Sequence, residues 1–176
     1  MENLIKKLQD MFAVKDVEDS KKKQILLTVK ASKVPSLLAY LKEFEGFKVL
    51  VMISTVDWIE TGKFQLSYIL NDPDEKNDLI IRAFISRKEA SMISIHSLWG
   101  HAATFQREIK EMYGIDFPGS PRVDEPFLLE GWDDIPPMRR DFDTKKYSED
   151  TFFPRPGRKT NDPAEYMKKR LYPDEK

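Results

Sequence analysis

Apolar side chains recur at helical spacing in three stretches of the chain. Residues 2–12 carry an apolar stripe among lysines and acids, and the sequence KVPSLLAYLKEFEG carries a second stripe that stops at Gly46. A third stripe runs from Ser97 to Tyr113 in steps of three and four residues, and Gly114 follows it as the expected C-cap. The pattern therefore predicts three helices.

Runs that are typical of β-strands lie between these helices, at residues 24–30, 47–58, 63–70 and 79–86. The short link IETG and the turn signal NDPDEKND separate the last three runs, which favours an antiparallel meander. The order of elements predicts an α+β fold: a mostly antiparallel sheet of about four strands with helices packed on one face.

The character of the chain changes after Phe117. Most of the eleven prolines lie beyond this residue, and no long periodic run precedes a short helix expected near 163–171. Large apolar side chains nevertheless recur there, and they need a surface to cover them: Phe127, Leu128, Leu129, Trp132, Phe142, Tyr147, Phe152 and Phe153. We therefore predict an α+β core domain over 1–117 and an extended tail over 118–176 that lies on another protein.

Composition narrows the classes of function. The 29 Lys and Arg against 30 Asp and Glu argue against a nucleic acid or an acidic membrane as partner, and favour a protein. The absence of Cys excludes a disulfide, a thiol nucleophile and any cluster or zinc site built on thiolates. We find no glycine-rich phosphate loop and no apolar run of membrane-spanning length, so we expect a soluble chain. The 34% of charged residues favours a heat-adapted source.

Glu108 and Glu111 lie on one face of the third predicted helix. A carboxylate pair can carry out acid–base chemistry, so a small hydrolase that grips an anionic substrate with Arg139 and Arg140 is one hypothesis. In the other, Arg107 pairs with Glu111 at i, i+4 and Glu108 faces a neighbour or solvent. We favour the second hypothesis, because adjacent helix positions seldom bracket a substrate.

Histidine and tryptophan offer two further candidates. His96 and His101 are five residues apart, so they cannot chelate a metal as an i, i+4 pair would, and we expect structural or interface roles. Trp99 and Trp132 are possible stacking platforms for a nucleic acid, which strongly salt-dependent binding would reveal. The balanced charge favours packing or an interface anchor instead.

Three stretches, LWGHAATFQREIKEMYGIDFPGSP, LLEGW and PMRRDF, resemble the signature region of the complex I thirty-kilodalton (C-subunit) family. That region has a helix ending in Glu-Arg-Glu, then an acid, a hydrophobic pair, Gly-Ile, a Phe, Gly-His-Pro, a Trp and Pro-Leu-Arg-Lys-Asp-Phe. The matching positions are Arg107, Glu108, Glu111, Met112, Gly114, Ile115, Phe117, Gly119, Pro121, Trp132, Pro137, Arg139, Arg140, Asp141 and Phe142.

The chain also departs from that pattern. Gln106 stands where the first Glu is usual, Ser120 replaces the His, and Asp124 and Glu125 fall where basic residues are common. The spacing from Trp to Pro is one residue longer. These departures favour a distant branch, which we expect to be the equivalent subunit of an archaeal membrane-bound [NiFe] hydrogenase or of a related sulfur-reducing complex.

The resemblance implies a non-catalytic assembly subunit of the peripheral arm of an ion-translocating membrane oxidoreductase. We expect a ferredoxin-oxidising hydrogenase or a sulfane or polysulfide reductase; the alternative is the C subunit of an NADH:quinone oxidoreductase. The implied location is the cytoplasmic side of the cell membrane. The implied partners are a [NiFe]-hydrogenase-like large subunit, a small iron–sulfur subunit, a ferredoxin-like iron–sulfur subunit and, indirectly, membrane subunits.

In this family the tail lies extended over the large subunit. The chain itself is expected to hold no cofactor, since the iron–sulfur clusters, and in a hydrogenase the [NiFe] centre, belong to the partners. We expect no catalytic or metal-binding residue, and we predict these residues at the subunit interface: Arg107, Glu108, Glu111, Phe117, Trp132, Arg139, Arg140, Asp141, Phe142, Phe152 and Phe153.

Overall fold

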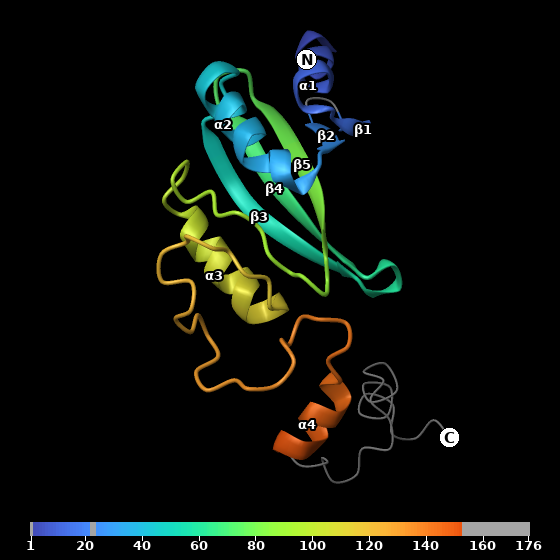
Figure 1. The fold of residues 1–176 in the computed structure, drawn as a ribbon, viewed down its shortest axis with the longest axis vertical. Coiled ribbons are helices and arrows are strands. Elements are labelled where there is room, and N and C mark those ends of the chain that lie inside the picture. Colours follow the sequence, from blue (N-terminus) through green and yellow to red (C-terminus); the bar gives the residue numbers. More distant parts are fainter. Residues whose placement is uncertain (1, 22–23, 153–176) are drawn as a thin grey trace, which may run out of the picture. The chain divides into compact units, whose positions relative to one another are not determined.

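The computed structural model describes residues 2–21 and 24–152. The chain divides into two compact units, Met1–Phe142 and Asp143–Lys176. The elements of the first unit (Figure 1) are α1 (Glu2–Phe12), β1 (Lys15–Lys21), β2 (Gln24–Thr28), the 3-10 helix η1 (Ala31–Lys33), α2 (Val34–Phe44), β3 (Val49–Trp58), the 3-10 helix η2 (Ile59–Thr61), β4 (Lys63–Asp72), β5 (Asn77–Ser86) and α3 (Ala102–Tyr113). The described part of the second unit contains α4 (Thr144–Phe152).

Five strands form one sheet in the order β1-β2-β5-β4-β3. The hairpins β3–β4 and β4–β5 are antiparallel, as the short links predict. β2 pairs in parallel with β5, because α2 carries the chain across the sheet from β2 to β3 and the two hairpin strands then fill the gap between them. The sequence missed β1, whose residues KDVEDSK are too polar to give a strand signal; β1 is antiparallel to β2 at the edge of the sheet.

Helices cover one face of the sheet, as predicted (Figure 1). Alternate residues of β4 are buried beneath α2, which contributes Leu37, Leu38 and Leu41 to the same core. α3 packs on this face as well, since the ring of Tyr113 meets the buried ring of Phe64 edge to face at 6.2 Å between centroids. The opposite face is covered by no described helix and leaves several large side chains half exposed.

β3 lies at the other edge of the sheet, where its outer carbonyls would be open to pairing with another chain. Side chains that follow β5 donate hydrogen bonds to two of them, His101 Nε2 to Leu50 at 2.9 Å and Tyr113 Oη to Thr55 at 3.1 Å, and Trp99 Nε1 donates to the carbonyl of Lys48, directly before β3, at 2.8 Å. A carbonyl can only accept, so His101 carries its proton on Nε2. Trp99 and His101 therefore have structural roles, as we expected.

The third helix begins later than its apolar stripe indicates. Residues 97–101 form turns, and α3 starts at Ala102. These turns aim Trp99 and His101 at β3, a tertiary constraint that local spacing does not reveal. The predicted C-cap is confirmed: Gly114 has φ +74°, and its N–H donates to the carbonyl of Lys110 at 2.8 Å.

The compact unit extends to Phe142, whereas the sequence placed the end of the core domain at Phe117. Residues 118–142 form turns and loops that are fixed to the core by the contacts described below. α4 was not predicted either, because its residues TKKYSEDTF lack a strong apolar stripe; Asp143 caps it by accepting the N–H of Lys146 at 2.9 Å. The helix predicted near 163–171 lies outside the described residues.

Candidate subunit interface

The carboxylate of Glu111 binds the backbone of residues 118–142, which we call the segment. The side chain of Glu111 projects from the face of α3 that lies against residues 127–129. Its oxygens accept the N–H groups of Phe127 at 2.7 Å, of Leu128 at 2.8 Å and of Leu129 at 3.1 Å. A carboxylate with three backbone donors behaves like an anion in a nest of amides. Glu111 therefore fastens residues 127–129 to α3, and we call this contact the Glu111 clasp.

The electrostatics of Glu111 follow from the clasp. Partial burial acts to raise its pKa, but hydrogen bonds from the backbone of Leu128, Leu129 and Phe127, together with the charge of Arg107, hold the pKa below its usual value. A general acid needs a raised pKa, so this carboxylate is poorly suited to donate a proton. Glu108 is exposed on α3, and the two carboxylates do not share an enclosed site.

Arg107 does not form the predicted i, i+4 ion pair with Glu111 within the described part of the chain. Its guanidinium carbon lies 5.3 Å from the centre of the Phe127 ring, a cation–π contact. The proposed pair is therefore replaced by a stack, because the amides of residues 127–129 already occupy the carboxylate. Arg107 nevertheless contributes to the same clasp, since it holds the ring next to the bound amides.

A second contact joins the end of the segment to the sheet. Asp57 of β3 is buried and forms an ion pair with Arg87, with 2.8 Å between Oδ1 and Nε. The other oxygen of Asp57 accepts the N–H of Arg140 at 2.9 Å. Arg87 also reaches Asp141 Oδ1 at 2.9 Å, so one guanidinium bridges a strand and the segment. We call these four residues the Asp57 cluster.

The neighbouring arginine completes this contact. Arg139 donates to Asp141, 3.1 Å from Nε to Oδ1, and its guanidinium carbon lies 5.8 Å from the centre of the Phe64 ring. Burial acts to raise the pKa of Asp141, but the hydrogen bond from Arg139 and the charges of Arg139 and Arg87 lower it on balance. The guanidinium of Arg140 pairs with Glu60 in η2. The guanidinium groups of Arg139 and Arg140 thus bind carboxylates of their own chain. They are therefore already paired and not free to grip the anionic substrate of the hydrolase hypothesis.

Two aromatic side chains close the segment on itself. The rings of Trp132 and Phe142 lie 5.6 Å apart, and Trp132 Nε1 donates to the carbonyls of Asp134 and Ile135, each at 3.1 Å. At the helix end, the N–H of Met138 donates to the carbonyl of Met112 at 3.0 Å. Trp132 therefore acts as a packing residue, which is the role we preferred over base stacking.

The remaining predicted interface residues have different positions. Phe117 is fully buried in the core, so its side chain presents no surface to a partner and the expectation for this residue is corrected. Phe152 is the last residue of α4, and Phe153 lies outside the described residues. For the other predicted residues, contact with a partner stays a prediction, and the structure adds that most of them also hold residues 118–142 in place.

The sequence missed three residues of this arrangement: Asp57, Arg87 and Lys110. Lys110 joins Asp116 at 2.8 Å and also pairs with Asp124. A signal for Asp57 existed, because it follows Ile53 and Thr55 at period two and so falls on the buried face of its strand. A charge at such a position needs a buried partner. Which arginine supplies it depends on the fold and could not be read from spacing.

The segment also leaves apolar side chains exposed. Leu128 is 70% exposed, Met138 54% and Ile135 41%, although the backbone beside them is hydrogen-bonded. An ordered backbone that presents apolar side chains is typical of a surface that binds another protein. Within residues 2–21 and 24–152 we find no cluster of three metal-ligating side chains and no helix with the length and apolarity to cross a membrane.

Comparison with known proteins agrees with the signature. The C subunit of NADH-quinone oxidoreductase from Moorella thermoacetica is 27% identical over 142 residues, which cover 81% of this chain and 95% of that protein. The C/D 2 subunit of NADH-quinone oxidoreductase from Aquifex aeolicus is 33% identical over 107 residues, or 60% of this chain; the chain spans only 18% of that longer protein.

Two solved structures share the fold. A chain of the membrane-bound sulfane sulfur reductase, described as an archaeal respiratory membrane complex, matches with a TM-score of 0.80 at 22% identity over 91% of this chain and 95% of that one. The trypsin-resistant fragment of Nqo5 matches with a TM-score of 0.60 at 20% identity over 68% of this chain and 96% of the fragment.

The family itself is shown by a match over the larger part of the chain. The model of the family described as the 30-kDa subunit of respiratory-chain NADH dehydrogenase covers residues 27–148, from β2 to α4. This range includes the Glu111 clasp and the Asp57 cluster. The chain therefore belongs to the 30-kDa subunit family of respiratory-chain NADH dehydrogenase.

Proposed function

We propose that the chain is a non-catalytic structural and assembly subunit in the peripheral arm of a complex I-related, ion-translocating membrane oxidoreductase. One observation carries the proposal: Glu111 of the family signature and Asp57 of β3 hold residues 118–142 on the core, and Leu128, Ile135 and Met138 stay exposed. Residues used in this way brace a docking surface, and Glu111 in particular is unsuited to act as a general acid.

The type of complex is a finer proposal. We infer a ferredoxin-oxidising hydrogenase or a sulfane or polysulfide reductase, with the C subunit of an NADH:quinone oxidoreductase as the alternative. The departures from the family pattern favour a distant branch of the family, and this supports the inference. Two of the departures lie in the interior: Gln106 accepts a hydrogen bond from Ser94 at 2.7 Å, and Ser120 is buried. Purifying the complex from its host and assaying hydrogen evolution, sulfane reduction and quinone reduction separates the alternatives.

The proposed partner of the exposed side chains is the [NiFe]-hydrogenase-like large subunit, with the small and the ferredoxin-like iron–sulfur subunits nearby. A photo-crosslinking amino acid at position 128 or 138 should attach to the large subunit in the intact complex. The same group at the exposed Phe44 of α2 serves as a control for random capture. Exclusive attachment of positions 128 and 138 to some other protein would refute this assignment.

The location and the cofactors belong to the same proposal. The chain would lie at the cytoplasmic side of the cell membrane. It would be linked to the membrane subunits indirectly, through the other peripheral subunits. Iron–sulfur clusters, and in a hydrogenase the [NiFe] centre, would lie in those partners. Metal analysis of the isolated chain should then give less than one iron or nickel atom per chain. The purified complex, which includes this chain, should contain the iron of the clusters.

Two variants distinguish a role in assembly from a catalytic role. Glu108→Gln removes an exposed charge from α3, and Glu111→Gln three residues later weakens the clasp. We expect the first to leave the isolated chain stable but weaken its assembly with the complex, and the second to weaken both. Turnover per assembled complex should stay at the wild-type level in each case. Normal assembly together with a collapse of turnover would overturn the proposal and favour a catalytic role.

A further inference from the structure

β5 has a short stretch of backbone that no described residue pairs on its outer side. The parallel pairing with β2 ends at Thr28 and Arg82, and the N–H of Val29 donates to the carbonyl of Arg82 at 2.9 Å. Backbone groups alternate between the two edges of a strand, so the C=O of Phe84 and the N–H of Ser86 point to the same side as the C=O of Arg82. No described backbone group bonds to either of them.

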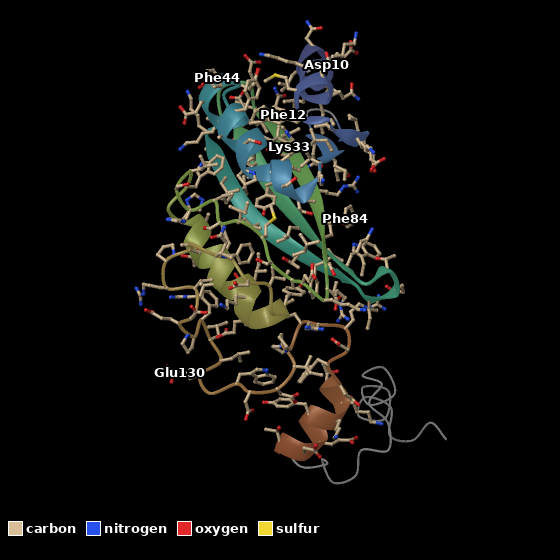
Figure 2. All side chains as sticks on the ribbon, viewed as in Figure 1. Asp10, Phe12, Lys33, Phe44, Phe84 and Glu130 are labelled. Atoms are coloured by element: carbon tan, nitrogen blue, oxygen red, sulfur yellow. The ribbon has the colours of Figure 1, made fainter. Side chains whose placement is uncertain are left out.

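The reason for this gap is the path of the chain after β2. Lys30 is extended, and the backbone then turns into η1 toward α2, on the helix-covered face. β5 continues to Ser86 without a paired strand on that side, and the 3-10 helix η1 lies near it without a backbone hydrogen bond to Phe84 or Ser86. Phe84 projects from this part of β5 (Figure 2) and is 39% exposed, a large apolar side chain beside an open strand edge.

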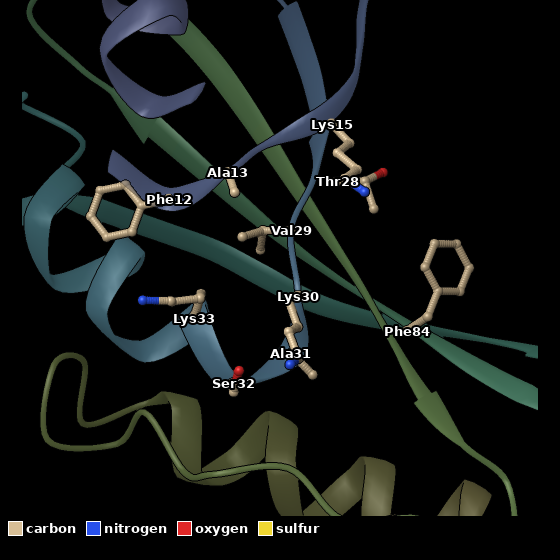
Figure 3. Close-up of a pocket in the computed structure, with 10 residues that line it drawn as sticks. All are labelled: Phe12, Ala13, Lys15, Thr28, Val29, Lys30, Ala31, Ser32, Lys33 and Phe84. Atoms are coloured by element: carbon tan, nitrogen blue, oxygen red, sulfur yellow. The ribbon is translucent and has the colours of Figure 1, made fainter. Parts of the chain in front are cut away.

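A groove of about 760 Å³ opens at the same place. Its walls are the junction of α1 and β1, the chain from the end of β2 into η1, and Phe84 of β5 (Figure 3). The volume is within the range of about 300–1,000 Å³ that is usual for ligand clefts. Most of the lining is apolar, and the charges that line it are all positive: Lys15, Lys30 and Lys33.

We propose that this groove binds an extended acidic segment of a partner protein, which adds to the sheet at β5. One residue of the segment pairs with the C=O of Phe84 and the N–H of Ser86. Its two neighbours place apolar side chains on the face of the sheet that carries Phe84, and other residues of the segment place carboxylates near the three lysines. Main-chain pairing supplies orientation, and the alternate side chains supply specificity, as in other cases of strand addition.

The observations favour an acidic peptide over other anions. A nucleic acid or a lipid surface can use the three lysines, but neither has the backbone donor and acceptor that the β5 edge requires. The net charge of the chain, –1, gives no general attraction for polyanions. The inference concerns a surface remote in sequence from the family signature, and it does not depend on the proposed function.

Titration of the full chain with a fluorescent peptide tests the proposal. The probe has about eight residues in which Asp or Glu alternates with Val. We expect weak binding, with a dissociation constant of about 0.1–1 mM, because the contact is small. Amide exchange measured by NMR should show new protection of the Ser86 N–H when the peptide is bound. The N–H of Arg87, which donates to Gly62 at 3.0 Å in the free chain, serves as an internal control.

Variants of the protein and of the peptide distinguish the contribution of charge from that of backbone hydrogen bonding. Lys30→Glu and Lys33→Glu should each weaken binding by about fivefold, as expected for one exposed ion pair. Lys6→Glu, which makes the same change on the exposed side of α1 outside the groove, should have little effect. A peptide of the same composition with methylated alternate backbone nitrogens keeps its charge but cannot pair, and it should bind at least about tenfold more weakly.

Several results would overturn the proposal. Equal binding of the methylated peptide would exclude strand addition, and equal binding to the Lys33→Glu variant would exclude the groove. A Ser86 amide that is already protected in the free chain would mean that the edge is occupied. Tighter binding of a single-stranded oligonucleotide or of anionic phospholipid vesicles at the same lysines would assign the site to another kind of partner.

Discussion

Replacing Glu111 by Gln tests whether the clasp holds residues 118–142 on the core. Glutamine has nearly the same shape and keeps one carbonyl oxygen, but it loses the charge and turns the second oxygen into an N–H donor. That oxygen, Oε2, accepts the N–H of Leu128 at 2.8 Å in the wild type. The variant therefore weakens the bonds to Phe127 and Leu129 and sets two donors against each other at Leu128.

The expected loss follows from the number and type of bonds. A hydrogen bond to a charged group contributes about 1.5–3 kcal/mol and a neutral one about 0.5–1.5 kcal/mol, so each amide loses about 1 kcal/mol when the charge is removed. Three amides would lose about 3 kcal/mol, and partial solvent exposure of the carboxylate reduces this to about 2 kcal/mol. Glu108→Gln, an equal change of charge at an exposed position of α3, should cost less than about 0.5 kcal/mol.

Hydrogen exchange at residues 127–129 measures this loss directly. A change of about 2 kcal/mol corresponds to about a thirtyfold fall in protection if these amides exchange by local opening. Urea unfolding of the first unit reports any global share of the effect. If the Glu111→Gln and Glu108→Gln variants protect these amides equally, the clasp contributes no stability and the reasoning is refuted.

The pKa of Glu111 also sets the dependence of the effect on pH. Its pKa is lower in the folded chain than in the unfolded chain, where it is near 4.5. The stabilisation is therefore complete above the unfolded value and is lost as the pH falls through the folded value. The difference in unfolding free energy between wild type and Glu111→Gln should be constant from about pH 8 to 6 and shrink below about pH 4. A difference that grows on acidification would contradict the assigned direction.

Three further predictions concern the core and its junction with the segment. Asp57→Ala leaves the Arg87 guanidinium without its buried partner and should lower the unfolding free energy by about 3 kcal/mol in urea titration. Gly114→Ala forces a Cβ into a left-handed position and within 3.2 Å of Pro136 Cγ, so thermal unfolding should show a loss of about 2 kcal/mol; Gly62→Ala, with φ +64° and open space around it, should lose only about 1 kcal/mol. Tyr68→Phe removes a buried hydroxyl that has no described partner and should be neutral or stabilising, whereas Tyr113→Phe removes the bond to the Thr55 carbonyl and should cost about 1 kcal/mol.

Local patterns in the sequence predicted most of the helices and strands of the fold. The three helices and four strands predicted before Phe117 are present, because each has an apolar period that matches its structure, and stop signals such as Gly46 and Gly114 end two of the helices. The polar edge strand β1 and the parallel pairing of β2 with β5 were missed. Both depend on partners distant in the sequence, and neither leaves a strong periodic signal.

The candidate site was recognised in part. The resemblance located Glu111, Trp132, Arg139 and Asp141, all of which take part in fixing the segment. It could not show that these residues bind their own chain, since composition indicates only that the region beyond Phe117 needs a surface. That surface turned out to be α3 and the end of the β3–β4 hairpin for residues 118–142, which is a property of the tertiary structure.

The proposed docking surface is held by internal charges, so a variant can weaken assembly in two different ways. A residue such as Glu111 or Asp57 can be essential for assembly without touching a partner, because its loss frees the backbone that presents Leu128 and Met138. A residue in direct contact would weaken assembly while the isolated chain stays stable. Comparing exchange protection of the free chain with assembly of the complex therefore separates supporting residues from contact residues, and Glu108, exposed on the same helix, is the position where the two explanations predict opposite results.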